Sequence, residues 1–548
     1  MAQTLRVALS TLGAALPVAL ILGPVVPGLI WALSPALDYD VWQALWLDPQ
    51  WPQALRATLI SSLLATVLSC TLACLLATLY YPGHLWISLR NRLPLLLSVP
   101  HAAFAVGLFF LISPSGWLAR AVAPVMQWSS PPDWTTVQDP YGLSLTFALA
   151  LKESWFLLWV LAAALGEAAV SRHIVMGRSL GYSRLQTWRL LVWPQLLPRL
   201  TWPVMAVFAY GLSVVDMAII LGPGTPPTLA VLIWRWLMDP EPALQARGSA
   251  ASLVLLGVLL VGAIAVRSAI WLWTRNRPYP SGRRSPIALR TAAAHKAFPF
   301  KWPLAHTPLF LVGYAVVAVL LAWSVAEAWF FPALVPDALT WDHWLQADWT
   351  PFWTSLWLAL ASSLLCLPAV LVWLEWGPQR WNALLYLPLI LPTLPLVAGQ
   401  YATLLHLQLD GSAIALVWSH LMWVLPYMLL TLIGPYRAVD PRLMRSARAL
   451  GCNPMQACVR VKWPMLLPPI LATLAVGFSV SVAQYLPTMF SGGGRFVTVT
   501  TEAVALSAGG NRRVLAVQSL LQIALPLAAF TLAILASQGL GRYRKGLR

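Results

Sequence analysis

Hydrophobic residues in this chain gather in long runs that short polar segments separate. Twelve runs reach the roughly 20 residues that an α-helix needs to cross the hydrocarbon of a bilayer. They fall near 7–33, 55–80, 93–114, 142–166, 200–222, 248–273, 304–331, 353–376, 383–405, 412–434, 466–490 and 514–538. The pattern predicts an all-α polytopic membrane protein with about twelve transmembrane helices.

The composition supports the bilayer as the partner of these runs. Of the 548 residues, 59% are hydrophobic and only 10% are charged, whereas a soluble globular protein carries roughly 25% charged residues. One large soluble core does not explain the difference, because cores stop growing beyond roughly 250–300 residues.

The net charge of +17 first suggests nucleic acid as a partner, but the predicted topology gives another explanation. With the N-terminus inside, 26 of the 35 basic residues lie on the cytoplasmic face and six on the opposite face. This is the positive-inside asymmetry of membrane proteins. We therefore expect no nucleic-acid partner, a multi-pass protein of the inner (cytoplasmic) membrane, and both termini in the cytoplasm.

The chain divides into two related halves. A basic, Pro-rich segment at 274–302 separates a first six-helix half, 1–273, from a second, 303–548. A cytoplasmic loop between the fourth and fifth spans recurs 270 positions later. The matches are Leu180/Leu450, Gly181/Gly451, Gln186/Gln456, Trp193/Trp463, Pro194/Pro464, Leu196/Leu466, Leu197/Leu467 and Pro198/Pro468. Internal repeats of this kind indicate repeated structural units.

Each loop copy predicts two short helices. A helical stretch meets Gly181 or Gly451, as helix C-termini commonly do. An amphipathic stretch follows, and we expect Pro194 or Pro464 to end it. Its apolar side chains are Leu185, Trp188, Leu191 and Val192 in the first loop, beside Arg184 and Arg189, and Met455, Val459 and Val461 in the second, beside Arg460 and Lys462. Such a helix either rests on lipid headgroups or docks on a partner; the identical spacing in both halves favours docking.

The doubled Leu-Gly, twelve residues, Pro pattern resembles the "EAA" loop of ABC importer permeases. The 6+6 arrangement and the stretch 484–513 resemble the fused permeases of the iron(III), thiamine and Ynj branch. The resemblance implies that each loop seats a coupling helix in a separate ABC ATPase dimer, and that a periplasmic or extracellular substrate-binding protein delivers the solute. The chain departs from the pattern at the Glu-Ala-Ala positions, which hold Val175, Met176 and Gly177, and Arg445, Ser446 and Ala447.

Ionisable residues inside the predicted spans are candidates for the translocation path, because such residues usually face a bundle interior or water. Asp216 and Gln484 lie in matching contexts, Ser213-x-x-Asp216 and Ser481-x-x-Gln484, and related permeases commonly have a Glu there. They either line the path or satisfy hydrogen bonds within helices. For Glu153 and its neighbour Lys152, the structural role is favoured.

The chain carries no GxxxxGK[ST] phosphate-binding loop. We therefore expect no cofactor, metal or catalytic residue in this chain, which is not an enzyme, and ATP bound by a partner subunit. The alternative is a twelve-helix secondary transporter driven by an ion gradient, although paired carboxylates are scarce. Asp-rich outer loops either dock the binding protein or are solvated loop ends. The solute, whether thiamine, ferric iron or another small molecule, is not specified by these residues.

Overall fold

The computed structural model describes residues 13–166, 168–276 and 307–542, and almost every element in it is helical. The predicted linker therefore lies almost wholly outside the described residues. In the first half the elements are α2 (Val25–Leu33), η1 (Ser34–Leu37), α3 (Tyr39–Trp46), α4 (Trp51–Tyr80), α5 (His84–Leu97), α6 (His101–Ile112), α7 (Trp117–Met126), α8 (Leu143–Leu165), α9 (Ala168–Ser179), α10 (Arg184–Thr187), η2 (Trp188–Val192), α11 (Trp193–Ser213), α12 (Asp216–Leu221), α13 (Leu229–Leu237) and α14 (Pro242–Asn276).

The second half begins with α16 (Thr307–Val325) and a two-stranded antiparallel hairpin, β1 (Ala326–Ala328) and β2 (Ala338–Leu339). Its remaining elements are α17 (Asp342–Leu345), α18 (Thr350–Trp376), η3 (Gln379–Trp381), α19 (Asn382–Leu385), α20 (Leu387–Ile390), α21 (Thr393–His406), α22 (Ala413–Ala438), α23 (Pro441–Ala449), α24 (Pro454–Ala457), η4 (Cys458–Lys462), α25 (Trp463–Met465), α26 (Leu467–Val482), α27 (Leu486–Gly492), α28 (Val499–Ser507) and α29 (Arg512–Arg542).

Among the described residues, eight helices are long and apolar enough to cross a membrane, or ten if each of two bent pairs forms one span. This bears out an all-α polytopic membrane protein. Several of the twelve predicted runs are broken rather than continuous. Pro100 and Pro392 stand immediately before α6 and α21, and the helical segments that meet before Thr393 are bent by 100°. Proline removes a backbone donor and clashes with the preceding turn, so the helix restarts there.

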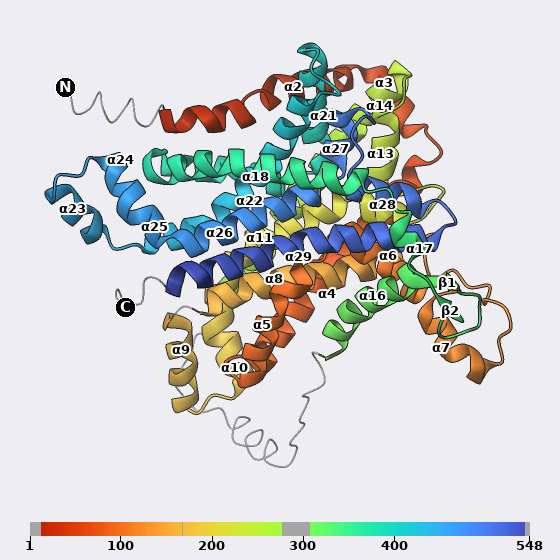
Figure 1. Cartoon of the computed structure of the whole chain (residues 1–548), viewed down its shortest axis with the longest axis horizontal. Helices are drawn as coiled ribbons and strands as arrows, with labels where there is room; N and C mark the ends of the chain where they lie inside the picture. Colours follow the sequence, from red (N-terminus) through yellow and green to blue (C-terminus); the bar gives the residue numbers. More distant parts are fainter. Residues whose placement is uncertain (1–12, 167, 277–306, 543–548) are drawn as a thin grey trace.

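Long helices of both halves lie side by side, and the two repeated loops lie at the same end of the molecule (Figure 1). In this view α9 and α10 are at the lower left and α23 and α24 at the upper left. The opposite end carries α3, α7, α17 and the hairpin. The two ends of the bundle are therefore built from different elements, and the repeated loops form one of them.

A helix near the start of each half packs against the other half: α2 contacts α21, and α16 contacts α6. Glycines permit both approaches. A Cβ added at Gly28 would collide with the Gly399 carbonyl oxygen, and one at Gly107 would collide with Val316. The two halves therefore interlock, and one hydrophobic core contains buried residues from both.

The candidate coupling loops and the central polar cluster

Both loop copies end their first helix in the same way. Gly181 has φ +81° and Gly451 has φ +90°, a left-handed conformation that glycine adopts without strain. In the first loop the N–H groups of Gly181 and Tyr182 donate to the carbonyls of Arg178 and Gly177, at 2.9 and 3.1 Å. The second loop repeats both bonds 270 positions later, each at 3.1 Å. This is a Schellman motif, as the two glycines predicted.

The second helix of each loop begins with a capping box. The Ser183 side chain accepts from the Gln186 N–H, and the Gln186 side chain accepts from the Ser183 N–H. Asn453 and Gln456 form the same reciprocal pair. The box satisfies two backbone donors at each helix start. The repeated Gln is therefore explained by helix capping rather than by contact with a partner.

The prolines do not end these helices, contrary to our expectation. A π-helical turn follows each capped turn, at Trp188–Val192 and Cys458–Lys462, and a new helix starts at Trp193 or Trp463. Pro194 and Pro464 lie in the first turn of that helix, where the missing N–H costs nothing. In the second half the bend of 80° comes after Met465.

The apolar side chains of the first loop face two ways. Trp188 was expected on the docking face, but it is only 1% exposed and packs against Tyr81 and Trp193 inside the permease. Leu185 is 71% exposed, and its repeat partner Met455 is 49% exposed. The outward surface is therefore narrower than the amphipathic pattern predicted.

We define the loop surface as the exposed side chains on the two copies. It consists of Arg460 and of three pairs of residues at repeat-related positions. The pairs are Leu180/Leu450, Leu185/Met455 and Arg189/Val459. The repeat pattern includes Leu180 and Leu450, but sequence reasoning did not predict them as site residues. Their location directly before the left-handed glycine is the signal that could have identified them.

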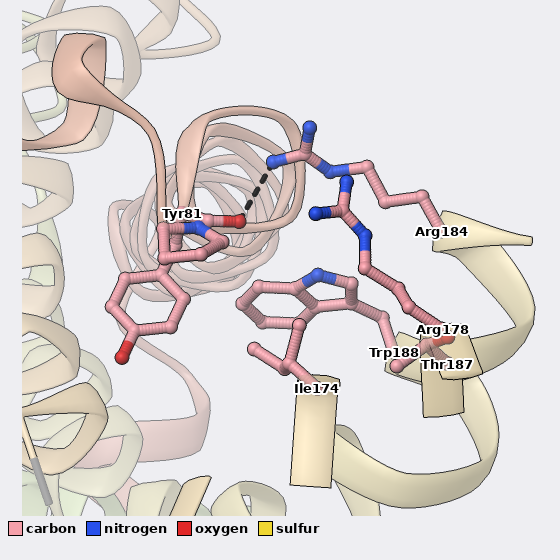
Figure 2. Close-up of a pocket in the computed structure, with 7 residues that line it drawn as sticks. Tyr81, Ile174, Arg178, Arg184, Thr187 and Trp188 are labelled. Carbon is pink, nitrogen blue, oxygen red and sulfur yellow. Dashed lines mark hydrogen bonds between the residues drawn. The ribbon is translucent and has the colours of Figure 1, made fainter. Parts of the chain in front are cut away.

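Arg184 is a structural anchor of the first loop. Its Nε donates to the Thr78 carbonyl at 2.6 Å, and an Nη donates to the Tyr81 carbonyl at 2.7 Å (Figure 2). Burial lowers the pKa of this guanidinium, and the neighbouring Arg178 lowers it further. The two bonds attach α10 to the end of α4. Arg184 therefore uses these donors within the permease itself.

A side-chain network anchors the second loop at the equivalent place, the end of α18. The Lys462 Nζ lies 2.6 Å from the Glu375 carboxylate and 3.9 Å from the centre of the Tyr436 ring. The Tyr436 hydroxyl donates to the same carboxylate at 2.6 Å. The second loop is thus attached to α18 and α22. Sequence reasoning did not identify Glu375, an acidic residue at the end of a predicted span.

Two of the predicted path residues lie in one polar cluster at the contact between the halves. Glu153 is buried, and its carboxylate lies 3.1 Å from His101 Nε2. The His101 ring lies 4.8 Å from the Tyr210 ring. Asp216 interacts electrostatically with His101 and with Tyr485 of the second half. We call His101, Glu153, Tyr210, Asp216 and Tyr485 the central cluster. His101 belongs to the cluster through its contacts with Glu153 and Tyr210.

Asp216 and Gln484 both occupy helix breaks, but their side chains differ in role. Asp216 is the first residue of α12 and is 8% exposed. Gln484 lies between α26 and α27, and its amide donates to the Val480 carbonyl at 3.2 Å. Lys152 turns away from the cluster and donates to the carbonyls of Leu96 and Val99. Among the described residues, no group of three or more His, Cys, Asp or Glu could hold a metal ion.

Several acidic residues of the predicted outer loops serve as caps of local structure. Asp38, Asp48, Asp239 and Asp348 each accept a hydrogen bond from the backbone N–H two residues later. Asp48 also pairs with Arg247 at 3.0 Å. The geometry therefore gives these carboxylates a structural use at the ends of loops.

The described helices define a multi-pass membrane protein with a duplicated loop at one end and buried polar groups between its halves. Over 549 residues, covering 100% of both chains, it is 41% identical to the inner membrane ABC transporter permease protein YnjC of Escherichia coli K12. It is 23% identical over 433 residues to the "Probable ABC transporter permease protein y4fN" of Sinorhizobium fredii, covering 74% of this chain and 72% of that one. No family model matches the chain.

The chain therefore belongs to the inner membrane permease proteins of ABC transporters. This confirms the family that the duplicated loop indicated, and the chain's length of 548 residues agrees with a fused double permease. The protein is a multi-pass protein of the inner membrane.

Proposed function

We propose that this chain forms the translocation path of an ATP-driven importer and couples to a separate ATPase dimer through its two cytoplasmic loops. ATP is bound by the ATPase subunits, and this chain breaks no bond. Both termini lie in the cytoplasm with the loops. A substrate-binding protein docks at the opposite end, where α3, α7 and the hairpin lie.

The observation that carries this proposal is the repetition of one loop geometry in both halves. Each copy has the same Schellman motif, capping box and π-helical turn, and each exposes an equivalent apolar side chain, Leu185 or Met455. A surface that only touches lipid does not need this correspondence. An ATPase dimer offers two related grooves, so two related loops fit it.

The anchors explain how movement of the loops reaches the membrane. Arg184 attaches the first loop to α4, and Lys462 attaches the second to α18 and α22. When the two ATPase subunits close, they draw the loops together and the attached helices follow. The halves then rock about the central cluster and open it to one side of the membrane at a time.

The test is copurification with an ABC ATPase that is coexpressed with this chain. We expect Leu185→Asp and Met455→Asp together to reduce the recovered ATPase and its stimulated activity at least tenfold, because a buried carboxylate in an apolar contact is costly. Leu345→Asp, which changes an 80% exposed leucine at the opposite end, is the matched control and should leave both unchanged.

Full ATPase recovery by the double variant would contradict docking through these loops. The gradient-driven alternative makes a different prediction: uptake of the solute that the neighbouring binding protein carries would continue without the ATPase and stop when an ionophore collapses the gradients.

A further inference from the structure

A small cavity opens between the first loop and the end of α4. It is partly open to solvent, and none of the residues of the outward loop surface lines it (Figure 2). Side chains from three segments enclose it. The lining residues are Tyr81, Pro82, Ile174, Arg178, Arg184, Thr187 and Trp188.

Two cations meet at this cavity. Figure 2 shows the guanidinium groups of Arg178 and Arg184 beside each other above the Trp188 ring. Arg184 uses two donors on carbonyls of α4, while Arg178 is exposed. None of the ion pairs between described side chains involves either arginine. The two like charges repel each other, and the charge of Arg178 contributes to the lowered pKa of Arg184. An anion bound between them would offset this repulsion.

The cavity adjoins the end of a candidate membrane span. Tyr81 directly follows α4, a helix long enough to span, and its ring contacts both Trp86 and Trp188 edge-on. Tyr and Trp concentrate where headgroups meet the hydrocarbon. Basic pockets between helices on the cytoplasmic side are suited to lipid phosphates.

The second loop lacks this arrangement, although its backbone is the same. Pro454 replaces Arg184 and Cys458 replaces Trp188 at the repeat positions, and only Arg448 corresponds to Arg178. The cation pair and its aromatic floor therefore belong to the first half alone. The ATPase grooves do not explain the difference, because both loops would meet related grooves.

We propose that the cavity between the first loop and α4 binds a phosphate group, with Arg178 and Arg184 as its ligands and Trp188 as its floor. Two sources offer this chemistry at the inner face, namely the phosphodiester of an anionic phospholipid and free phosphate. A bound phosphate joins α9 and α10 to the end of α4, and so stiffens the first loop at its anchor. The site does not depend on the ATPase coupling proposed above.

The experiment titrates the purified full-length chain in detergent with short-chain phosphatidylglycerol and follows the rise in thermal unfolding temperature. Short-chain phosphatidylcholine and inorganic phosphate are titrated in parallel. Arg178→Gln removes one ligand, and Arg448→Gln is the matched control, since it removes one charge at the repeat position where Pro454 and Cys458 stand in place of Arg184 and Trp188.

We expect the apparent affinity for phosphatidylglycerol to fall at least fivefold in Arg178→Gln and to stay within twofold of wild type in Arg448→Gln and Arg178→Lys. An Arg178-dependent response to inorganic phosphate as strong as that to phosphatidylglycerol would assign the site to the free anion. Equal affinities for Arg178→Gln and Arg448→Gln would overturn the proposal. So would an equal response to phosphatidylcholine.

Discussion

The Asp139 carboxylate organises the start of α8. It accepts hydrogen bonds from the N–H groups of Tyr141, Leu143 and Ser144, at 3.1, 2.8 and 2.9 Å, and from the Ser144 hydroxyl at 3.0 Å. Burial alone would raise the pKa of this carboxyl, but the hydrogen bonds of Leu143, Ser144 and Tyr141 together hold it below its ordinary value. The Asp139 carboxylate therefore has a structural role, because it accepts hydrogen bonds from neighbouring residues of its own loop and helix.

Replacing this carboxylate should make stability depend differently on pH. Because the folded pKa is depressed, the carboxylate stabilises the protein above the unfolded value of about 3.9, and this contribution is lost as the pH falls through the folded pKa. We expect Asp139→Asn to cost about 1–2 kcal/mol at pH 7. Thermal unfolding in detergent at pH 7 and near pH 3 should show the difference from wild type shrinking on acidification. A constant difference would contradict this role.

At the scale of elements, the repeated loop is specified mostly by local interactions. Gly181, Gln186 and their repeat partners lie where a Schellman motif and a capping box require them. These bonds join residues at most five positions apart. The sequence pattern predicted the helix ends at the two glycines, whereas the capping boxes were found only in the structure. The π-helical turn was not predicted, and neither was the inward rotation of Trp188, which packs against Tyr81 at the end of α4.

The left-handed glycine of the second loop offers a local test. No atom lies within 4 Å of a Cβ added at Gly451, so Gly451→Ala changes only the backbone energy, by about 1–2 kcal/mol. We expect hydrogen exchange at the Cys452 amide to accelerate by roughly 5- to 30-fold. Gly434→Ala, in open space within α22 and without a positive φ, is the control and should not accelerate exchange. Unchanged exchange at Cys452 would show that the motif does not limit loop opening.

At the scale of the whole molecule, the two halves are not separate bodies. Helix α2 of the first half packs against α21 of the second, and α16 of the second half packs against α6 of the first. The Ser213 hydroxyl of the first half also lies 3.3 Å from the Thr393 hydroxyl of the second. The central cluster lies at the contact between the halves, and three of its residues, His101, Asp216 and Tyr485, lie at helix breaks. Irregular backbone within a membrane is tolerated where protein buries it or water lines it, which agrees with a path between the halves.

Asp216 is the residue of the central cluster whose loss should affect transport most directly. We expect Asp216→Ala to lower uptake at least tenfold while expression and ATPase recovery stay normal, because the carboxylate faces groups from both halves. Gln484→Ala is the comparison and should lower uptake less, since its amide already donates to the Val480 carbonyl of the preceding helix, α26. Normal uptake by Asp216→Ala would remove this residue from the path.

The sequence by itself determined the membrane class, the two related halves, the duplicated loop and the family. These properties follow from apolar run length, from residues close together in the chain and from resemblance, so no tertiary contact is needed to read them. Only the tertiary structure decided which loop side chains face outward, how Arg184 and Lys462 anchor the loops, and which buried ionisable groups meet. Those outcomes depend on contacts between residues tens to hundreds of positions apart, where helix breaks and glycine-mediated packing set the neighbours.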